Sequence, residues 1–224
     1  MKDVISRVRV RNIRPLNRLL SIVFTALLVM TAGGCATTVR PPAAPLKPVT
    51  IYLTDENIHS SVVLPTDDGR YVKYAFGDWT YATMAHRDLF HAFLALFFSR
   101  QAALGRKYLI LDPSSKDLSP DLKGIKTNTL VVDRDRVRAL EARLDACFRP
   151  GRPQAESSYD HVLWVAVDDP YALWSNCNTL TKANLRKLGC EVISRSFFAF
   201  YSVEAPIAPP SPPHSVAYLR TASR

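Results

Sequence analysis

Cys177 has the clearest chemical potential in this chain, because the residues around it predict a helix that begins at the thiol. Ser175 or Asn176 can cap this helix by accepting hydrogen bonds from its first backbone amides, and Gly189 stands where a left-handed residue commonly ends a helix. A thiol in the first turn lies at the positive end of the helix dipole. That position favours the thiolate, which is both the nucleophile and the metal ligand. The alternative is that Cys177 is only a small buried apolar residue.

A nucleophilic thiol needs a base, and His59 is the candidate. It precedes a β-branched run, residues 60–64, which is typical of a strand and stops at Pro65. A neutral imidazole brought beside Cys177 would take the thiol proton and later return it to a leaving group. The backbone amides of Cys177 and of the next residue are candidate donors to an oxyanion.

A third polar group should orient the imidazole, and Asp78 is the candidate, because it ends the next expected strand and holds the Gly-Asp position of a family motif that residues 74–79 resemble, described below. An aspartate after a glycine is equally consistent with an ordinary turn. His161 is an alternative orienting group that no motif supports. The sequence therefore predicts a catalytic set of Cys177, His59 and Asp78.

Three stretches of the chain resemble motifs of the DUF2459 family of bacterial envelope proteins. Residues 171–189 are similar to its C-terminal signature, a Tyr followed by a Thr-Cys-Asn core and an Ala-Leu-rich helix ending in Gly. Residues 57–65 are similar to its Gly-Trp-His-Thr motif, which leads into a strand ending in Pro, and residues 74–79 to its Phe-Gly-Trp-Gly-Asp motif. The resemblance covers residues 51–201, and the positions that match its C-terminal signature are Tyr171, Cys177, Asn178, Leu185 and Gly189.

The family in turn resembles a circularly permuted branch of the papain-like NlpC/P60 superfamily, in which a strand histidine precedes the helix cysteine, as His59 precedes Cys177. The resemblance implies an α+β fold, with an antiparallel sheet packed on helices. It also implies a thiol hydrolase or acyltransferase that acts on an amide or ester, in cell-wall peptides or in lipids. Leu180 stands where the family has Trp, and Asn57-Ile58 replaces its Gly-Trp. These departures motivate an alternative, a non-catalytic envelope lipoprotein that serves as a binding or structural module.

The N-terminal segment predicts export. Basic residues precede an apolar run at 19–30, and Thr31-Ala32-Gly33-Gly34-Cys35 resembles the lipobox of bacterial lipoproteins, whose cysteine is acylated. We therefore expect a signal peptide over 1–34 and a lipid on Cys35 that holds the protein on a membrane of the envelope, facing the periplasm. An uncleaved signal anchor is the alternative.

The remaining chain divides by composition. Residues 35–48 are rich in proline and predict an extended tether, 49–204 predict the NlpC/P60-like domain, and 205–224 predict a proline-rich tail. With 224 residues, 47% of them hydrophobic, the chain has one globular domain with appendages. The net charge of +9 comes largely from the N-terminal segment, and the other basic residues are dispersed, so no nucleic-acid partner is expected.

Besides the helix that begins at Cys177, the sequence predicts two long helices that separate groups of strands. Helices are expected at 84–99 and 134–148, the second capped by Asp133, and the type of element at 161–165 stays open. The expected strands are 49–53, 60–64, 71–76, 107–111, 129–132, 190–194 and 197–203.

The other histidines and cysteines give no metal site or cofactor. His86 and His91 are five residues apart and so lie on different faces of their helix, unlike the i, i+4 pair of a zinc helix. The chain has no Cys-x-x-Cys, so a four-cysteine zinc site is not expected. Cys147 and Cys190 are consistent either with a disulfide in an oxidising compartment or with buried, inert thiols.

Overall fold

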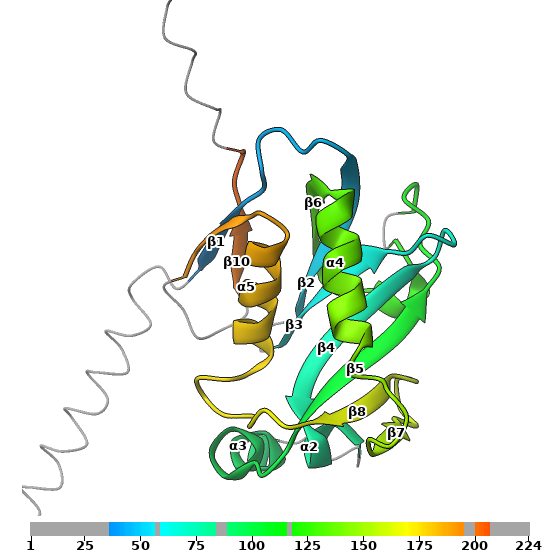
Figure 1. The fold of residues 1–224 in the computed structure, drawn as a ribbon. Coiled ribbons are helices and arrows are strands. Elements are labelled where there is room, and N and C mark those ends of the chain that lie inside the picture. The colour runs from blue at the N-terminus through cyan, green and yellow to red at the C-terminus, as the bar shows by residue number, and fades with distance from the viewer. Residues whose placement is uncertain (1–35, 57–58, 84–88, 116–117, 195–199, 207–224) are drawn as a thin grey trace, which may run out of the picture.

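Seven strands form one antiparallel sheet in the order β6-β2-β3-β4-β5-β8-β7 (Figure 1). The structure is a computed structural model, and it describes residues 36–56, 59–83, 89–115, 118–194 and 200–206. The strands of this sheet are β2 (Pro48–Glu56), β3 (His59–Pro65), β4 (Tyr71–Asp78), β5 (Ala102–Leu109), β6 (Lys126–Asp133), β7 (Gln154–Glu156) and β8 (Leu163–Val167). The open question at 161–165 is thereby answered, because most of this stretch belongs to strand β8.

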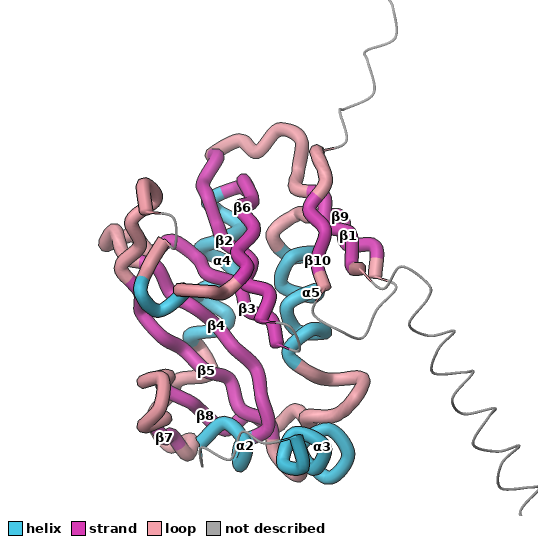
Figure 2. Tube along the Cα trace, turned by 180° about the vertical axis from the view of Figure 1, so that it is seen from behind, coloured by secondary structure: helices cyan, strands magenta, loops and turns pink. Residues whose placement is uncertain are grey.

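Two helices cover one face of the large sheet, α4 (Arg134–Asp145) and α5 (Cys177–Lys187) (Figures 1 and 2). The main hydrophobic core lies between them and the sheet. It combines alternate side chains of the central strands, such as Leu53, Val62 and Tyr74, with Leu140 of α4 and Leu185 of α5. The expected α+β class, an antiparallel sheet packed on helices, is confirmed.

The opposite face of the sheet has two smaller clusters. Trp164 of β8 packs with alanines of β4, β5 and α2 (Trp79–Thr83), and Tyr52 of β2 packs with Leu122 of the short 3-10 helix Pro120–Leu122. Helix α3 (Leu89–Phe98) follows α2 at one end of the sheet (Figure 1). The long apolar helix expected over 84–99 is therefore observed from Leu89, and residues 84–88 lie outside the described ranges.

A second sheet has three strands in the order β10-β1-β9, where β1 is Thr37–Arg40, β9 is Glu191–Ile193 and β10 is Tyr201–Val203. Strand β1 pairs antiparallel with β9 and parallel with β10. It lies inside the stretch for which the proline content predicts an extended tether. Because Thr37 and Val39 are fully buried, this part of the stretch belongs to the fold.

Local turn and cap signals in the sequence agree with the structure. Gly69 has φ +84° in the hairpin between β3 and β4, and Gly189 has φ +89° just after α5. Asp133 caps α4 by accepting from the Asp135 amide. Within the described ranges no helix is both long and apolar enough to span a membrane, and the apolar run at 19–30 lies outside those ranges.

Candidate active site

Cys177 is the first residue of α5, and a complete N-terminal cap fixes its position. The Asn176 side chain accepts from the amides of Asn178 and Thr179 at 3.0 and 3.1 Å, and the Thr179 hydroxyl accepts from the Asn176 amide at 2.8 Å. This reciprocal pair is a capping box. The cap expected from Asn176 is confirmed. Cys177 itself is buried, with 4% of its surface exposed.

His59, the first residue of β3, lies beside Cys177, near enough for charge and hydrogen bonding to shift the pKa of both side chains. Burial lowers the pKa of His59, but the negative charge of Cys177, hydrogen bonding to it and the charge of Glu56 outweigh burial and raise the pKa. Burial likewise raises the pKa of Cys177, but the His59 charge and hydrogen bond, the Ser60 amide and the Tyr171 hydroxyl lower it below that of an ordinary thiol. The opposite shifts favour a thiolate beside an imidazolium.

Strand β3 and helix α5 are joined at this point by two buried hydrogen bonds. The Ser60 hydroxyl donates to Oδ1 of Asn178 at 2.8 Å, and the Thr181 hydroxyl donates to the Ser60 carbonyl at 3.2 Å. The Ser60 hydroxyl also lies 3.1 Å from the Tyr201 hydroxyl of β10. Because buried polar contacts of this kind require one register, they hold the start of β3 against the first turns of α5.

Tyr171 also contacts the thiol. Its hydroxyl donates to the Cys177 sulfur at 3.9 Å and also accepts from the Cys177 amide. The ring packs against Phe76 of β4, with 5.6 Å between ring centroids. Burial and the charge of Cys177 raise the pKa of Tyr171, so its hydroxyl stays protonated and remains a donor. The other amide expected to serve an oxyanion, that of Asn178, is bonded to the Asn176 cap.

Glu56 is the acidic residue that faces His59. The two are direct cross-strand partners at the end of the β2–β3 hairpin, so their side chains stand on the same face of the sheet. The Glu56 carboxylate also accepts from Lys73 and, at 3.1 Å, from the Thr54 hydroxyl. Burial raises the pKa of Glu56, but the charges of Lys73 and His59 outweigh burial and hold it below its ordinary value. An ionised carboxylate therefore stands beside the imidazole.

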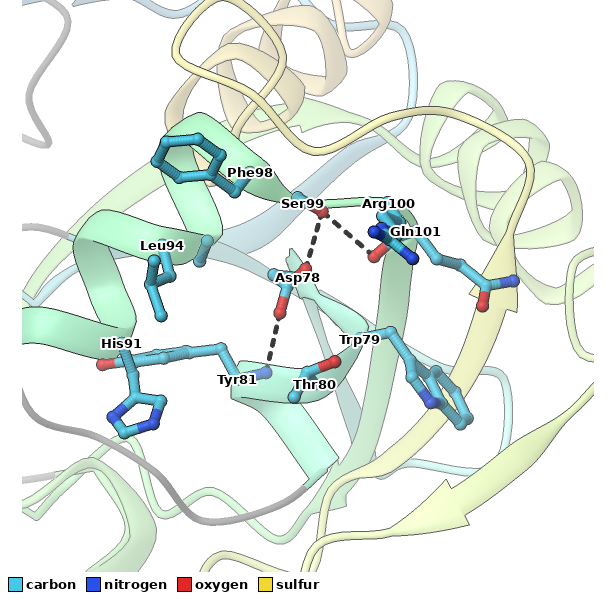
Figure 3. Close-up of a pocket in the computed structure, with 11 residues that line it drawn as sticks. Asp78, Trp79, Thr80, Tyr81, His91, Leu94, Phe98, Ser99, Arg100 and Gln101 are labelled. Atoms are coloured by element: carbon cyan, nitrogen blue, oxygen red, sulfur yellow. Dashed lines mark hydrogen bonds between the residues drawn. The ribbon is translucent and has the colours of Figure 1, made fainter.

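Asp78, the residue expected to orient the imidazole, is bonded at the beginning of α2 (Figure 3). One carboxylate oxygen accepts from the Tyr81 amide at 2.8 Å, and the other accepts from the Ser99 hydroxyl at 2.6 Å. These bonds make Asp78 the cap of α2. It also lines a pocket of about 340 Å³ between α2 and α3, together with Leu94, Arg100 and others. Glu56, and not Asp78, is therefore the carboxylate opposite His59. Asp78 instead stabilises the beginning of α2.

The alternative orienting group, His161, lies in the turn before β8. Its φ is +53°, its ring is exposed, and its Nδ1 lies 3.3 Å from the Glu156 carboxylate. These contacts tie it to the surface hairpin of β7 and β8. His91, which the sequence predicts to be an ordinary helix residue, lines the pocket beside α3 (Figure 3), and His86 lies outside the described residues.

Cys147, Cys177 and Cys190 are free thiols. Of the two alternatives for Cys147 and Cys190, the disulfide is therefore not formed in the structure. Cys190 belongs to the main core, and burial raises its pKa to about 11. Cys177 is thus the described thiol whose surroundings favour ionisation. Cys35 lies outside the described residues. Among the described residues, no group of three or more His, Cys, Asp or Glu side chains is arranged to hold a metal ion.

Two contributors to this site were missed by sequence reasoning. The position of Glu56 follows from hairpin geometry, since only two residues separate it from His59, and a two-residue loop makes its flanking residues direct partners. The sequence around Ser60 does not indicate that it bonds to α5, because that contact depends on which face of β3 packs against the helix. Comparisons with protein-family models, curated proteins and solved structures give no match to the chain, so the resemblance to DUF2459 and NlpC/P60 proteins stays a prediction.

Proposed function

We propose that the protein is a thiol hydrolase or acyltransferase with a permuted papain-like arrangement, in which Cys177 attacks the carbonyl of an amide or ester. The observation that carries the proposal is the juxtaposition of the Cys177 thiol and the His59 ring, each of which moves the pKa of the other toward the ion pair. A thiolate is the nucleophilic form of cysteine, and an imidazolium is a proton donor for a leaving group.

In the first step the Cys177 sulfur forms a bond to the carbonyl carbon, and the carbonyl π electrons move to oxygen. The Tyr171 hydroxyl oxygen occupies a place within reach of both the Cys177 sulfur and the Cys177 amide. A substrate oxygen near that place would accept from this amide and from the Tyr171 O–H, which burial keeps protonated. These two donors would stabilise the oxyanion.

The intermediate then collapses, and the bond to the leaving amine or alcohol breaks as His59 donates its proton. A thioester on Cys177 and a neutral imidazole remain. Water, or an acceptor alcohol or amine, attacks the thioester while His59 takes its proton, and the thiolate leaves. Glu56 acts as a positioning residue, because its carboxylate faces His59 and favours the imidazolium through each cycle.

We further propose that the enzyme is held by a lipid on Cys35 and faces the periplasm. The segment that supports this proposal is the apolar run at 19–30 followed by small residues and Cys35. Cell-wall peptides and membrane lipids are the substrates within reach of such an enzyme. A screen of muropeptides and lipid esters against the protein and its Cys177→Ala variant would separate these two classes.

Alkylation of the thiol tests the proposal directly. Full-length protein is treated with iodoacetamide across pH, and alkylation of each cysteine peptide is followed by mass spectrometry. We expect Cys177 to react at a pH below that of an ordinary thiol and His59→Ala to move its reaction to higher pH. Cys190 is the matched internal control: it is as buried as Cys177, at 5% against 4% exposure, but its pKa is raised, so it should stay unreacted. Ordinary pH dependence of Cys177, unchanged in His59→Ala, would refute the proposal.

The burial of Cys177 favours a second candidate function, a binding or structural module that keeps the fold without catalysis. Only 4% of the residue is exposed, which limits the approach of a substrate to the sulfur. Complementation distinguishes the two candidates. If Cys177→Ala restores every phenotype of a deletion strain, the module is supported, whereas if it restores none while being present at normal abundance, the enzyme is supported.

A further inference from the structure

Leu173 and Trp174 form the tip of a tight turn just before the candidate nucleophile. The flanking residues Ala172 and Ser175 bond to each other twice through their backbones, at 2.8 and 2.9 Å. The Asn176 side-chain amide donates to the Leu173 carbonyl at 2.8 Å. The turn therefore holds a fixed shape, yet it presents Leu173 at 38% and Trp174 at 77% exposure. Two large apolar residues at the tip of a fixed turn need a partner, because tight turns ordinarily carry small or polar residues.

Further apolar surface lies on the same side of the molecule. The loop between β8 and α5, which carries the turn, runs beside α3 in both views (Figures 1 and 2). In the last turn of α3, Phe97 is 55% exposed and Phe98 is 67% exposed. Gatherings of exposed aromatic side chains mark sites of protein or membrane interaction. We call Phe97, Phe98, Leu173 and Trp174 the apolar edge.

The place where the chain joins the fold indicates what covers this edge. If Cys35 carries a lipid, only Ala36 precedes β1, and two residues reach about 7 Å. The Thr37 amide donates to the Phe200 carbonyl at 2.7 Å, and Phe200 is 48% exposed. The beginning of β1, the loop and α3 lie along the same edge of the molecule, on the left in Figure 1 and on the right in Figure 2, with β1 level with the middle of α5. The anchor would thus draw this edge of the molecule, rather than the opposite one, toward the bilayer.

The composition of the edge suits a bilayer interface. Tryptophan is enriched at the boundary between lipid and water, where its ring lies among the headgroups. Exposed Arg100 follows α3, while Asp168 and Asp169 begin the loop and are also exposed. Charges of both signs thus flank the apolar residues. We therefore expect binding by apolar insertion, with little dependence on anionic lipid.

We propose that the apolar edge inserts into the surface of the lipid bilayer and holds the Cys177 end of α5 at that interface. This inference rests on the proposed function for its anchor and for the role of Cys177. Asn176 links the two features, because it bonds to the Leu173 carbonyl and caps the helix that Cys177 begins. Substrates would then be amphiphiles whose ester or amide group lies at headgroup depth.

Quenching of tryptophan emission by brominated lipid tests this proposal. The full-length protein is reconstituted in phosphatidylcholine vesicles whose acyl chains carry bromine. The chain has three tryptophans, and Trp164 is buried while Trp79 is half-buried. We expect emission to be quenched in the unaltered protein, most of this quenching to be lost in Trp174→Phe, and Leu173→Glu to reduce it. Equal quenching with and without Trp174 would overturn the proposal.

Ile110 supplies the matched control. It is 81% exposed and follows β5 at the end of the sheet away from α2, since Leu109 pairs with Tyr71 and Ala102 pairs with Asp78. Ile110→Glu should leave quenching unchanged. Tryptophan emission could instead be unquenched by brominated lipid and shift to shorter wavelength as protein concentration rises. That result would identify a second copy of the chain as the partner and overturn the proposal.

Alkylation of Cys177 in the same vesicles separates this inference from the proposed function. Quenching of Trp174 by bromine together with ordinary reactivity of the Cys177 thiol would support insertion of the apolar edge into lipid and reject the proposed enzymatic function. A reactive thiol with an unquenched Trp174 would support the enzyme and reject the lipid surface.

Discussion

Removing the Asn176 side chain should both destabilise the protein and weaken the thiolate. Asn176 is 4% exposed, and its side chain makes three hydrogen bonds. Two of them satisfy the Asn178 and Thr179 amides, and the third holds the Leu173 carbonyl. Asn176→Ala loses all three. Asn176→Ser is the matched variant, because serine is an equally good cap but has no amide to reach Leu173.

The size of the effect follows from these bonds. Loss of an N-cap costs about 1 kcal/mol, within a range of about 0.5–2. The bond to the Leu173 carbonyl adds about 1 kcal/mol, the usual net value of a hydrogen bond. We therefore expect Asn176→Ala to lower the free energy of unfolding by about 2 kcal/mol. Asn176→Ser should lower it by about 1 kcal/mol.

Urea unfolding of the full-length protein, followed by circular dichroism and by tryptophan emission, measures this difference. The midpoint should fall without a change in slope, since the surface exposed on unfolding is the same. Alkylation of Cys177 near neutral pH should slow in Asn176→Ala, because a frayed first turn loses the field that favours the thiolate. If alanine leaves the unfolding free energy unchanged, or if serine costs as much as alanine, the cap does not have the role assigned to it.

Two further substitutions probe the packing and the charge balance. Gly105→Ala should lower the free energy of unfolding in urea by about 1–3 kcal/mol, because the new Cβ would lie 2.7–2.9 Å from side chains already present. Gly77→Ala is the control and should be near neutral, because its Cβ would have neighbours only at 3.6 Å or beyond. Equal effects of the two substitutions would contradict the packing. Glu56→Gln should lower the pH at which the His59 ring titrates by NMR, since the carboxylate helps to raise that pKa. An unmoved His59 titration would refute the role of Glu56. The pKa of Glu56 is itself held low in the fold, so its contribution to stability is present above the ordinary carboxyl pKa and is lost as pH falls through the lowered value, and a pH series of urea midpoints should lose this component in Glu56→Gln.

Local signals predicted the elements whose ends are set by a few residues. Helix α5 was predicted with its cap and its closing Gly189, because capping depends on residues within one turn of each end. Strand β1 was missed, because prolines follow it at once and its partners β9 and β10 lie more than 150 residues away. Its four residues carry too little pattern to reveal a pairing so distant in sequence.

In the candidate site, too, contacts set by nearby residues could be predicted, whereas contacts set by the packing of distant elements could not. The meeting of Cys177 and His59 was expected from a resemblance and not from local physics, because it depends on how α5 packs on β3. Asp78 was chosen from a motif position, but a carboxylate at the end of a strand can also cap the helix that follows, and here it does. Glu56 was within reach of prediction through hairpin register, whereas the contact of Tyr171 with the thiol depends on the path of a whole loop.

The place of β1 between two strands has a mechanical consequence. Tension on the chain ahead of Thr37 would run along the strand axis, so the ladders to β9 and β10 would bear it in shear, with their hydrogen bonds loaded together. Since β9 follows α5 and packs against it, the load would pass next to the helix that begins with Cys177. A membrane tether attached ahead of Thr37 would therefore load the small sheet and α5, next to the candidate site, before it loaded the large sheet.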